Sequence, residues 1–398
     1  MNIATVPTSV ACALAAAATL TVSAAAADDS DNFHHKRPEF RVVNLSSLGG
    51  SENAGNSIND HALVAGFANL PDNNSRHAML WLYGFRFDLG TLGGPNSNVP
   101  WPVKNTSGLI AGIAQTTTPQ PRGETWSCRS FFATPTRAAA TCLGVVWEEG
   151  KIRALPTLGG NNGFATGANN HRQVVGWAEN TVEDPSCVRP QILQFRATLW
   201  GPDLDKVREL PPLTGDSTSA ATGINDKGQV IGISGACGTA VGGVAARHAV
   251  LWEKGKPIHL GNLGGIAWNT PMALNERGDI VGFSNISAAD GAAFNARAFL
   301  WERGRMMDLN ELVPDDYADH LYTANDINNL GQITGYTVKA GTEDSLAFWA
   351  LPLGKHGHDD SDADSITASN DAKRVPLPAQ ARQLVLARAG ATEAQLGR

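Results

Sequence analysis

The chain has little charge, few aromatic residues and few apolar runs. Charged residues make up 17% of its 398 residues and aromatic residues 7%, and the formal net charge is −7. No basic stretch supplies the electrostatic footprint of a nucleic-acid binder, so we expect no nucleic acid among its partners. Beyond the N-terminal region, no segment approaches the length of a transmembrane helix, so we expect no membrane insertion. Glycine is abundant at 42 residues and proline numbers 21, which predicts many turns.

Cysteine is also scarce, with five residues in all. None forms a C-x-x-C pair, which argues against a structural zinc site. We therefore predict no metal site and no cofactor. Cys12 lies in the N-terminal segment, and the four that remain are an even number, which indicates disulfides if the compartment is oxidising.

The N-terminal segment has the composition of a targeting sequence. An alanine-rich run, VACALAAAATLTVSAAAA, precedes DDSD, and its last alanines suit signal peptidase cleavage. We predict a signal peptide over residues 1–27 and a flexible linker over 28–39. The signal peptide implies a secreted or periplasmic bacterial protein. We also expect the protein to be a monomer. The alternative is a membrane anchor, although the run is short for a span.

The remainder of the chain repeats one pattern six times, and fixed-period repeats indicate a repeat architecture. An asparagine is followed seven residues later by a glycine that ends a Val/Ile-rich run, and a tryptophan comes after it. The six asparagine/glycine pairs are Asn59/Gly66, Asn105/Gly112, Asn169/Gly176, Asn225/Gly232, Asn275/Gly282 and Asn328/Gly335. The six tryptophans are Trp81, Trp147, Trp200, Trp252, Trp301 and Trp349.

A Leu-x-x-Leu element recurs six times as well. One copy lies in DLGTLGG at residues 88–94, whose glycines look like a phosphate-binding loop. Its siblings include NLSSLGG, ALPTLGG and HLGNLGG. Because one chain does not normally need six phosphate sites, we interpret these glycines as structural.

Each repeat of about 54 residues predicts four short strands, a to d. Strand a ends at the asparagine, b is the Val/Ile-rich run, c ends at the tryptophan, and d carries Leu-x-x-Leu. We predict an all-β, six-bladed β-propeller over residues 40–353, whose last blade is closed by an N-terminal strand in FRVVNLSSL. A linear β-solenoid is the alternative. Residues 354–398 are predicted to be a polar, largely disordered tail.

The repeat resembles the HAF family of extracellular repeat proteins, named for a His-Ala-Phe triplet before Leu-Trp. The I-N-x-x-G-x-V-x-G pattern and DLGTLGG carry the resemblance over roughly residues 40–352. No copy here reads His-Ala-Phe in full, which argues against a repeated catalytic histidine. The resemblance implies an extracellular repeat protein and no particular activity.

Strand direction separates two rims of the predicted propeller. The a–b and c–d links, which are short, form a turn rim, and the longer b–c and d–a links form a loop rim. Variable loops on a rigid scaffold commonly carry binding. On this reading all four cysteines lie in b–c loops, and we predict the disulfides Cys128–Cys142 within blade 2 and Cys187–Cys237 between blades 3 and 4.

Candidate binding residues gather on the loop rim. Four tryptophans fall outside the repeat pattern, and exposed rings would suit a glycan or a protein partner; the alternative is that they cover blade ends. An acidic segment with a histidine could bind a cation or serve as acid and base, or be a solvated loop. The candidates are Trp101, Trp126, Trp177, Trp268, Asp316, Asp319 and His320.

These features predict a non-enzymatic binding module or scaffold that recognises a glycan or a cell-envelope protein through the loop rim. One alternative is a hydrolase or lyase with its site at the mouth of the central channel. That reading requires converging carboxylates or histidines, which the repeats do not supply at equivalent positions, and we assign no catalytic residues. A structural component of the surface or matrix is the other alternative.

Overall fold

The computed structural model describes residues 45–59, 63–82, 85–102, 104–124, 128, 131–132, 140–238, 241–342 and 345–352. All of these residues lie in one compact unit, Leu45–Arg398. The predicted signal peptide, the linker and the C-terminal tail lie outside the described residues, as do Trp126 and residues 40–44 of the predicted closing strand.

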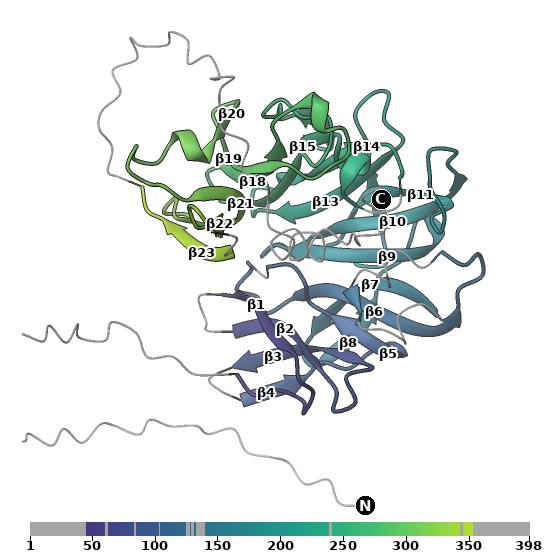
Figure 1. The fold of residues 1–398 in the computed structure, drawn as a ribbon. Helices are drawn as coiled ribbons and strands as arrows, with labels where there is room; N and C mark the ends of the chain where they lie inside the picture. The colour runs from purple at the N-terminus through teal and green to yellow at the C-terminus, as the bar shows by residue number, and fades with distance from the viewer. Residues whose placement is uncertain are drawn as a thin grey trace, which may run out of the picture. The chain divides into compact units, whose positions relative to one another are not determined.

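Six antiparallel sheets follow one another around a ring, which confirms the six-bladed β-propeller (Figure 1). Blade 1 has β1 (Asn53–Ile58), β2 (Leu63–Asn69), β3 (Arg76–Leu82) and β4 (Phe85–Asp88). Blade 2 has β5 (Gly93–Asn98), β6 (Ile110–Pro119), β7 (Ala140–Glu148) and β8 (Lys151–Ala154). Blade 3 has β9 (Gly159–Ala168), β10 (Val174–Glu183), β11 (Leu193–Trp200) and β12 (Val207–Leu210).

The other three blades follow the same order. Blade 4 has β13 (Thr218–Ile224), β14 (Val230–Gly235), β15 (His248–Glu253) and β16 (Lys256–His259). Blade 5 has β17 (Thr270–Leu274), β18 (Ile280–Asn285), β19 (Ala296–Glu302) and β20 (Arg305–Asp308). Blade 6 has β21 (His320–Ile327), β22 (Ile333–Val338) and β23 (Ser345–Ala350), and no fourth strand among the described residues.

The Leu-x-x-Leu element follows the fourth strand in blades 1, 2, 4 and 5, contrary to the sequence-based prediction, and in blade 3 only its first residue, Leu210, belongs to the strand. β4 ends at Asp88, and Leu89 and Leu92 lie in the crossing to blade 2, where both pack against that blade. Leu45 and Leu48 pack on blade 1 in the same way. DLGTLGG is therefore the end of a blade followed by a crossover anchored by leucines.

Each repeat asparagine closes its own a–b turn, and those of blades 1 to 5 also bind the next blade. The side-chain oxygen of Asn225 accepts from the backbone N–H of Gln229 at 3.0 Å, while its amide donates to the carbonyl of Asn275 at 3.1 Å. Equivalent bonds join successive blades from blade 1 to blade 6. The recurring asparagine is explained by this chain of inter-blade hydrogen bonds on the turn rim.

The turn glycines have a left-handed backbone, which glycine adopts without steric cost. Gly228 has φ 74° and Gly278 φ 95°. Arg172 replaces the glycine in blade 3 and adopts φ 58°, a conformation that is uncommon for a residue with a side chain, and its guanidinium binds Glu148. Ala62, the other replacement, lies outside the described residues.

The repeat glycine within each second strand is required for a different reason. A Cβ at Gly66, Gly176 or Gly335 would lie 1.9 Å from a carbonyl oxygen of the neighbouring inner strand. The inner strand is irregular at this level, with register shifts beside the glycine. Only glycine leaves room for this approach of two backbones.

The repeat tryptophans join each blade to the crossover before it. Their rings are buried in blades 1 to 4, and the indole N–H donates to a carbonyl of the preceding Leu-x-x-Leu segment. The four bonds are Trp81 to Ser46, Trp147 to Leu89, Trp200 to Pro156 and Trp252 to Pro211.

Trp349 does not occupy the sixth tryptophan position, which corrects the sequence-based alignment. In blade 5, Trp301 pairs with Ile280, two residues before the repeat glycine. In blade 6 the corresponding Ile333 pairs with Ala350. A displacement of one residue turns a strand side chain to the opposite face, and Trp349 is 62% exposed.

Apolar clusters fill five of the blade interfaces. They join blades 1 and 2, 2 and 3, 3 and 4, 4 and 5, and 5 and 6. Among the described residues, no such cluster joins blade 6 to blade 1. Instead Lys104, before β6 of blade 2, forms an ion pair with Asp326 of blade 6 and donates to the carbonyl of Ile327 at 2.7 Å.

Candidate functional site

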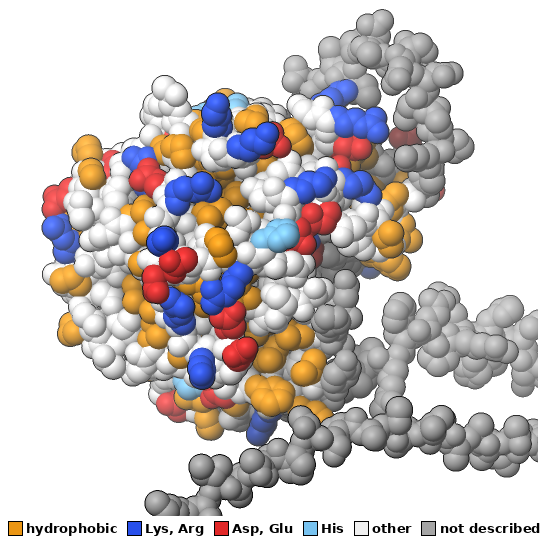
Figure 2. Space-filling view, turned by 180° about the vertical axis from the view of Figure 1, so that it is seen from behind, with side chains coloured by type: hydrophobic (Ala, Val, Ile, Leu, Met, Phe, Trp, Pro, Cys, Tyr) orange, Lys and Arg blue, Asp and Glu red, His pale blue; other side chains and the backbone are white. Residues whose placement is uncertain are grey.

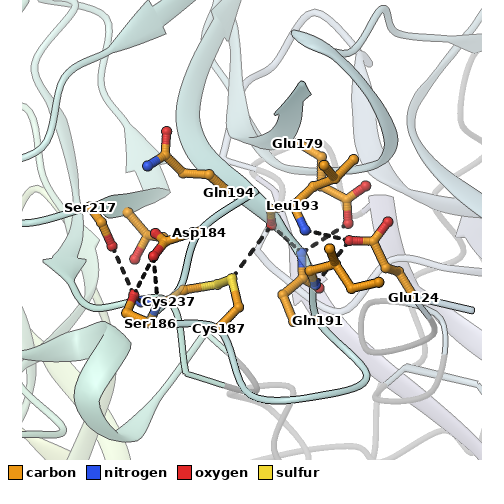
Figure 3. Close-up of a disulfide and its surroundings, with 12 residues drawn as sticks. Glu124, Glu179, Asp184, Ser186, Cys187, Gln191, Leu193, Gln194, Ser217 and Cys237 are labelled. Carbon is orange, nitrogen blue, oxygen red and sulfur yellow. Dashed lines mark hydrogen bonds between the residues drawn. A yellow bond between two sulfur atoms is a disulfide. The ribbon is translucent and has the colours of Figure 1, made fainter. Parts of the chain in front are cut away.

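The predicted disulfides are confirmed. Cys128 is bonded to Cys142 in blade 2, and Cys187 is bonded to Cys237, which joins blades 3 and 4 on the loop rim (Figure 3). Cys142 lies in β7 itself and not in the loop before it. Two disulfides indicate an oxidising compartment outside the cytoplasm. Among the described residues no helix is long and apolar enough to cross a membrane.

A pair of buried carboxyl groups lies beside the second disulfide (Figure 3). Glu124, from the b–c link of blade 2, accepts from the backbone N–H groups of Ile192 and Leu193. Glu179 of β10 accepts from the backbone N–H of Asn162 at 2.9 Å. Both side chains are 0% exposed. Glu124 thus fastens the long loop of blade 2 onto blade 3.

The protonation of this pair is unusual. Burial, and then the charge of Glu124, raise the pKa of Glu179 to about 7. A carboxyl group with such a pKa suits general acid–base chemistry. However, full burial keeps both carboxyl groups from a substrate, so the pair acts on loop packing rather than on a ligand.

Three of the four candidate tryptophans are buried, so the expectation of exposed rings is wrong for them. Trp101, Trp177 and Trp268 are 4%, 1% and 2% exposed. Trp101 and Trp177 pack with Phe164 at ring-centroid distances of 5.5 and 4.4 Å. Trp268 packs on Phe294 at 5.2 Å. They belong to an aromatic core shared by blades 2 to 6 on the loop rim.

The predicted acidic segment does not converge on one point. Asp316 is exposed, and Asp319 accepts from the backbone N–H of Ala340 at 2.8 Å. His320 begins β21, where burial and then the positive charge of Arg297 lower its pKa to about 4. In the described part of the chain, the group close enough to share an ion is Asp184 with Cys187 and Cys237, and its sulfurs form the disulfide.

The inner strands of blades 3 to 5 leave little space between them. A cavity of about 20 Å³ is lined by backbone and small or apolar side chains of β9, β13 and β17. Lys104 is the charged residue of this lining, and it is already paired with Asp326. This cavity has room for about one water molecule and no converging acid and base.

A larger hollow lies on the turn rim, opposite the predicted loop rim. This turn-rim groove, of about 790 Å³, runs across blades 4, 5 and 6. Ile258 is 42% exposed and Leu330 is 72% exposed, and Trp301 and Pro352 contribute further apolar surface. Charged side chains border it; on the face shown in Figure 2, groups of both signs are likewise interspersed.

Trp301, which lines the groove, differs from its siblings in its hydrogen bonding. Its indole nitrogen is buried and has no hydrogen-bond partner among the described residues, whereas the tryptophans of blades 1 to 4 donate to the preceding crossover. A buried donor without an acceptor is unfavourable by about 1–3 kcal/mol.

The turn-rim groove was not predicted from the sequence, although the sequence contains one signal for it. Leu330 lies in an a–b turn where the sibling turns carry Lys227 and Arg277. An apolar residue in an exposed turn of a repeat marks a departure from the pattern. Trp301 gave no such signal, because it matches its siblings in sequence.

The fold and these sites define the chain as a β-propeller. No protein-family model and no curated protein matches it. It is similar to the acylaminoacyl peptidase of Pyrococcus horikoshii, with TM-score 0.43 and 14% identity, over 75% of this chain and 44% of that one. It is also similar to the β-propeller domain of the Trilobed protease of Pyrococcus furiosus, with TM-score 0.41 and 10% identity, over 75% and 80%. The chain thus spans less than half the length of the first protein.

Proposed function

We propose that this protein is a non-enzymatic binding module, secreted or periplasmic, that takes an extended segment of a protein partner into the turn-rim groove. The observation that carries the proposal is the groove of about 790 Å³ with the exposed apolar side chains of Ile258 and Leu330 in its wall. Pockets of this volume with apolar walls and a few directed polar groups are typical binding sites.

A polypeptide fits this groove better than a glycan. Glycan binding favours flat, exposed aromatic rings, and three of the four tryptophans considered for that role are buried. The groove presents aliphatic side chains, among them Ile258 and Leu330, and charged side chains of both signs border it. A peptide supplies apolar side chains to the walls and charged side chains to the border.

Selection from a library of random 12-residue peptides tests the proposal. Peptides enriched on the full chain should bind at least tenfold more weakly to Leu330→Glu, which places a charge in the groove at an exposed position. Phe85→Glu is the matched control, because Phe85 is 73% exposed and lies in blade 1. Enrichment of no peptide, or equal binding to both variants, would overturn the proposal.

The same proteins applied to a glycan array separate the two ligand classes. Glycan binding that survives Leu330→Glu would place recognition elsewhere and contradict the proposal. The absence of glycan binding, together with groove-dependent peptide binding, would support it.

A further inference from the structure

The turn-rim groove lies where the chain leaves the propeller. β23 ends at Ala350, and Pro352, the last described residue, lines the groove together with Leu330 and Gly331. Residues 353–398 therefore begin at the edge of the hollow. A segment of this tail is a candidate occupant by position alone.

One tail segment has the chemistry that the groove requires. Residues 373–378 read Lys-Arg-Val-Pro-Leu-Pro. Pro376 and Pro378 fix the backbone near polyproline II, a conformation without internal hydrogen bonds that leaves its carbonyls free to accept. Grooves that bind such segments combine apolar or aromatic walls with hydrogen-bond donors.

The walls of the groove match this segment in charge as well. Glu253 and Glu302 border it; Glu253 accepts from the neutral Gln229 at 3.1 Å, whereas Glu302 lies 3.6 Å from the guanidinium of Arg303. Asp279, the third acidic residue of the lining, is paired with Arg277 at 2.7 Å. Lys373 and Arg374 of the incoming segment would therefore lie near Glu253, which no cation among the described residues binds.

We propose that Lys373–Pro378 of this chain docks in the turn-rim groove, so that an outside partner must displace it. Val375 and Leu377 contact the apolar walls, and Lys373 and Arg374 face Glu253. The proposal rests on the proposed function, because it assigns the regulation of the same groove.

The length of the connecting segment permits this docking. About 20 residues separate Pro352 from Lys373. A flexible chain of that length has a root-mean-square span of roughly 25 Å. Tethering at such a distance gives an effective concentration in the millimolar range. A weak intramolecular contact is therefore sufficient to keep the groove occupied.

Limited trypsin digestion of the full chain tests the docking. The bonds after Lys373 and Arg374 lie in the docked segment, whereas those after Arg382 and Arg388 lie in the same tail and serve as internal references. Mass spectrometry should show cleavage after Lys373 and Arg374 at least fivefold slower than at the references. Equal rates at all four bonds would overturn the proposal.

Variants of the groove locate the protection. Leu330→Glu and Ile258→Glu should bring cleavage after Arg374 to the reference rate, while the control Phe85→Glu should retain the protection. Protection that persists in both groove variants would place the tail elsewhere and overturn the inference. Thermal unfolding of each variant checks that the propeller remains folded.

Peptide binding separates this inference from the proposed function. If the tail is unprotected but selected peptides still bind the groove, the docking fails and the binding function stands. If neither the tail nor any peptide engages the groove, both fail. If the tail docks, Glu253→Gln, which removes the charge that Lys373 and Arg374 face, should reduce the protection severalfold.

Discussion

Blades 3 and 4 meet through a continuous apolar interface, whereas blades 6 and 1 share no apolar cluster among the described residues. At the first interface Leu199 of β11 is 6% exposed and packs between the two sheets. By register, the equivalent position in blade 6 is Trp349, and it is 62% exposed. The same strand position is therefore a core residue in one blade and a surface residue in another.

This difference shows that repeats of similar sequence need not pack alike. The chain of asparagine hydrogen bonds runs from Asn59 to Asn328, and the amide of Asn328 donates to Gln332 of its own turn. In the described part of the chain, Lys104 of blade 2 contacts blade 6 directly. Within these residues five interfaces between blades are alike, and the interface between blades 6 and 1, here called the seam, differs from them.

The largest effect should come from truncating the two equivalent positions. Leu199→Ala removes a buried side chain and should destabilise the protein by about 2–5 kcal/mol. Trp349→Ala removes an exposed side chain and should cost less than about 1 kcal/mol. Chemical denaturation of both variants measures the difference. A cost for Trp349→Ala equal to that for Leu199→Ala would show that the seam is packed.

The buried carboxyl pair should make the blade 2–blade 3 interface sensitive to pH. The pKa of Glu179 is raised from 4.5 to about 7, so the folded state binds more protons than the unfolded chain between these values. Its stabilising contribution is complete below about pH 4.5 and is lost as the pH rises through 7. The loss should be on the order of 3 kcal/mol.

Glu179→Gln should flatten that dependence, because the amide does not titrate. Denaturation at pH 4.5, 6 and 8 compares it with wild type and with Glu183→Gln, a nearby side chain that is 66% exposed. Arg122 pairs with Glu183, and this ion pair is unchanged in Glu179→Gln. An unchanged pH slope in Glu179→Gln would refute the assignment.

The asparagine hydrogen bonds should contribute more to the free energy of unfolding where they join two blades than at the seam. Asn225 is 3% exposed and bonds both to its own turn and to Asn275, so Asn225→Ala should cost about 2 kcal/mol. Asn328 is exposed and bonds within its own turn, so Asn328→Ala should cost about half as much. Equal losses in Tm would indicate that Asn328 also binds across the seam.

The smallest effect should come from the tie to blade 6. Lys104→Met removes the ion pair with Asp326 and the hydrogen bond to Ile327, and should cost about 1 kcal/mol. Lys206→Met is the control, since Lys206 is 83% exposed and lies 3.6 Å from Asp203, and it should cost almost nothing. A higher salt concentration should reduce the difference in unfolding free energy between Lys104→Met and Lys206→Met. Identical unfolding midpoints would remove Lys104 from the account of the seam.

The repeat pattern was sufficient to predict much of the fold. The spacing of asparagine, glycine and tryptophan predicted six units of short strands, and the positions of the cysteines within them predicted both disulfides. Closure of blade 6 by the strand from Phe40 stays a prediction, since residues 40–44 are outside the described residues. The site was predicted less well, because the loop-rim tryptophans Trp101, Trp177 and Trp268 are core residues.

The sequence by itself determined the number of blades, their order and the residues that build each turn, because these depend on local spacing repeated along the chain. Tertiary structure alone decided that Trp349 faces outward, that the indole of Trp301 lacks an acceptor and that Glu179 lies buried beside Glu124. Each of these features depends on the register between two strands or on which blade a loop reaches. Strand register and loop placement are not encoded in the spacing within one repeat.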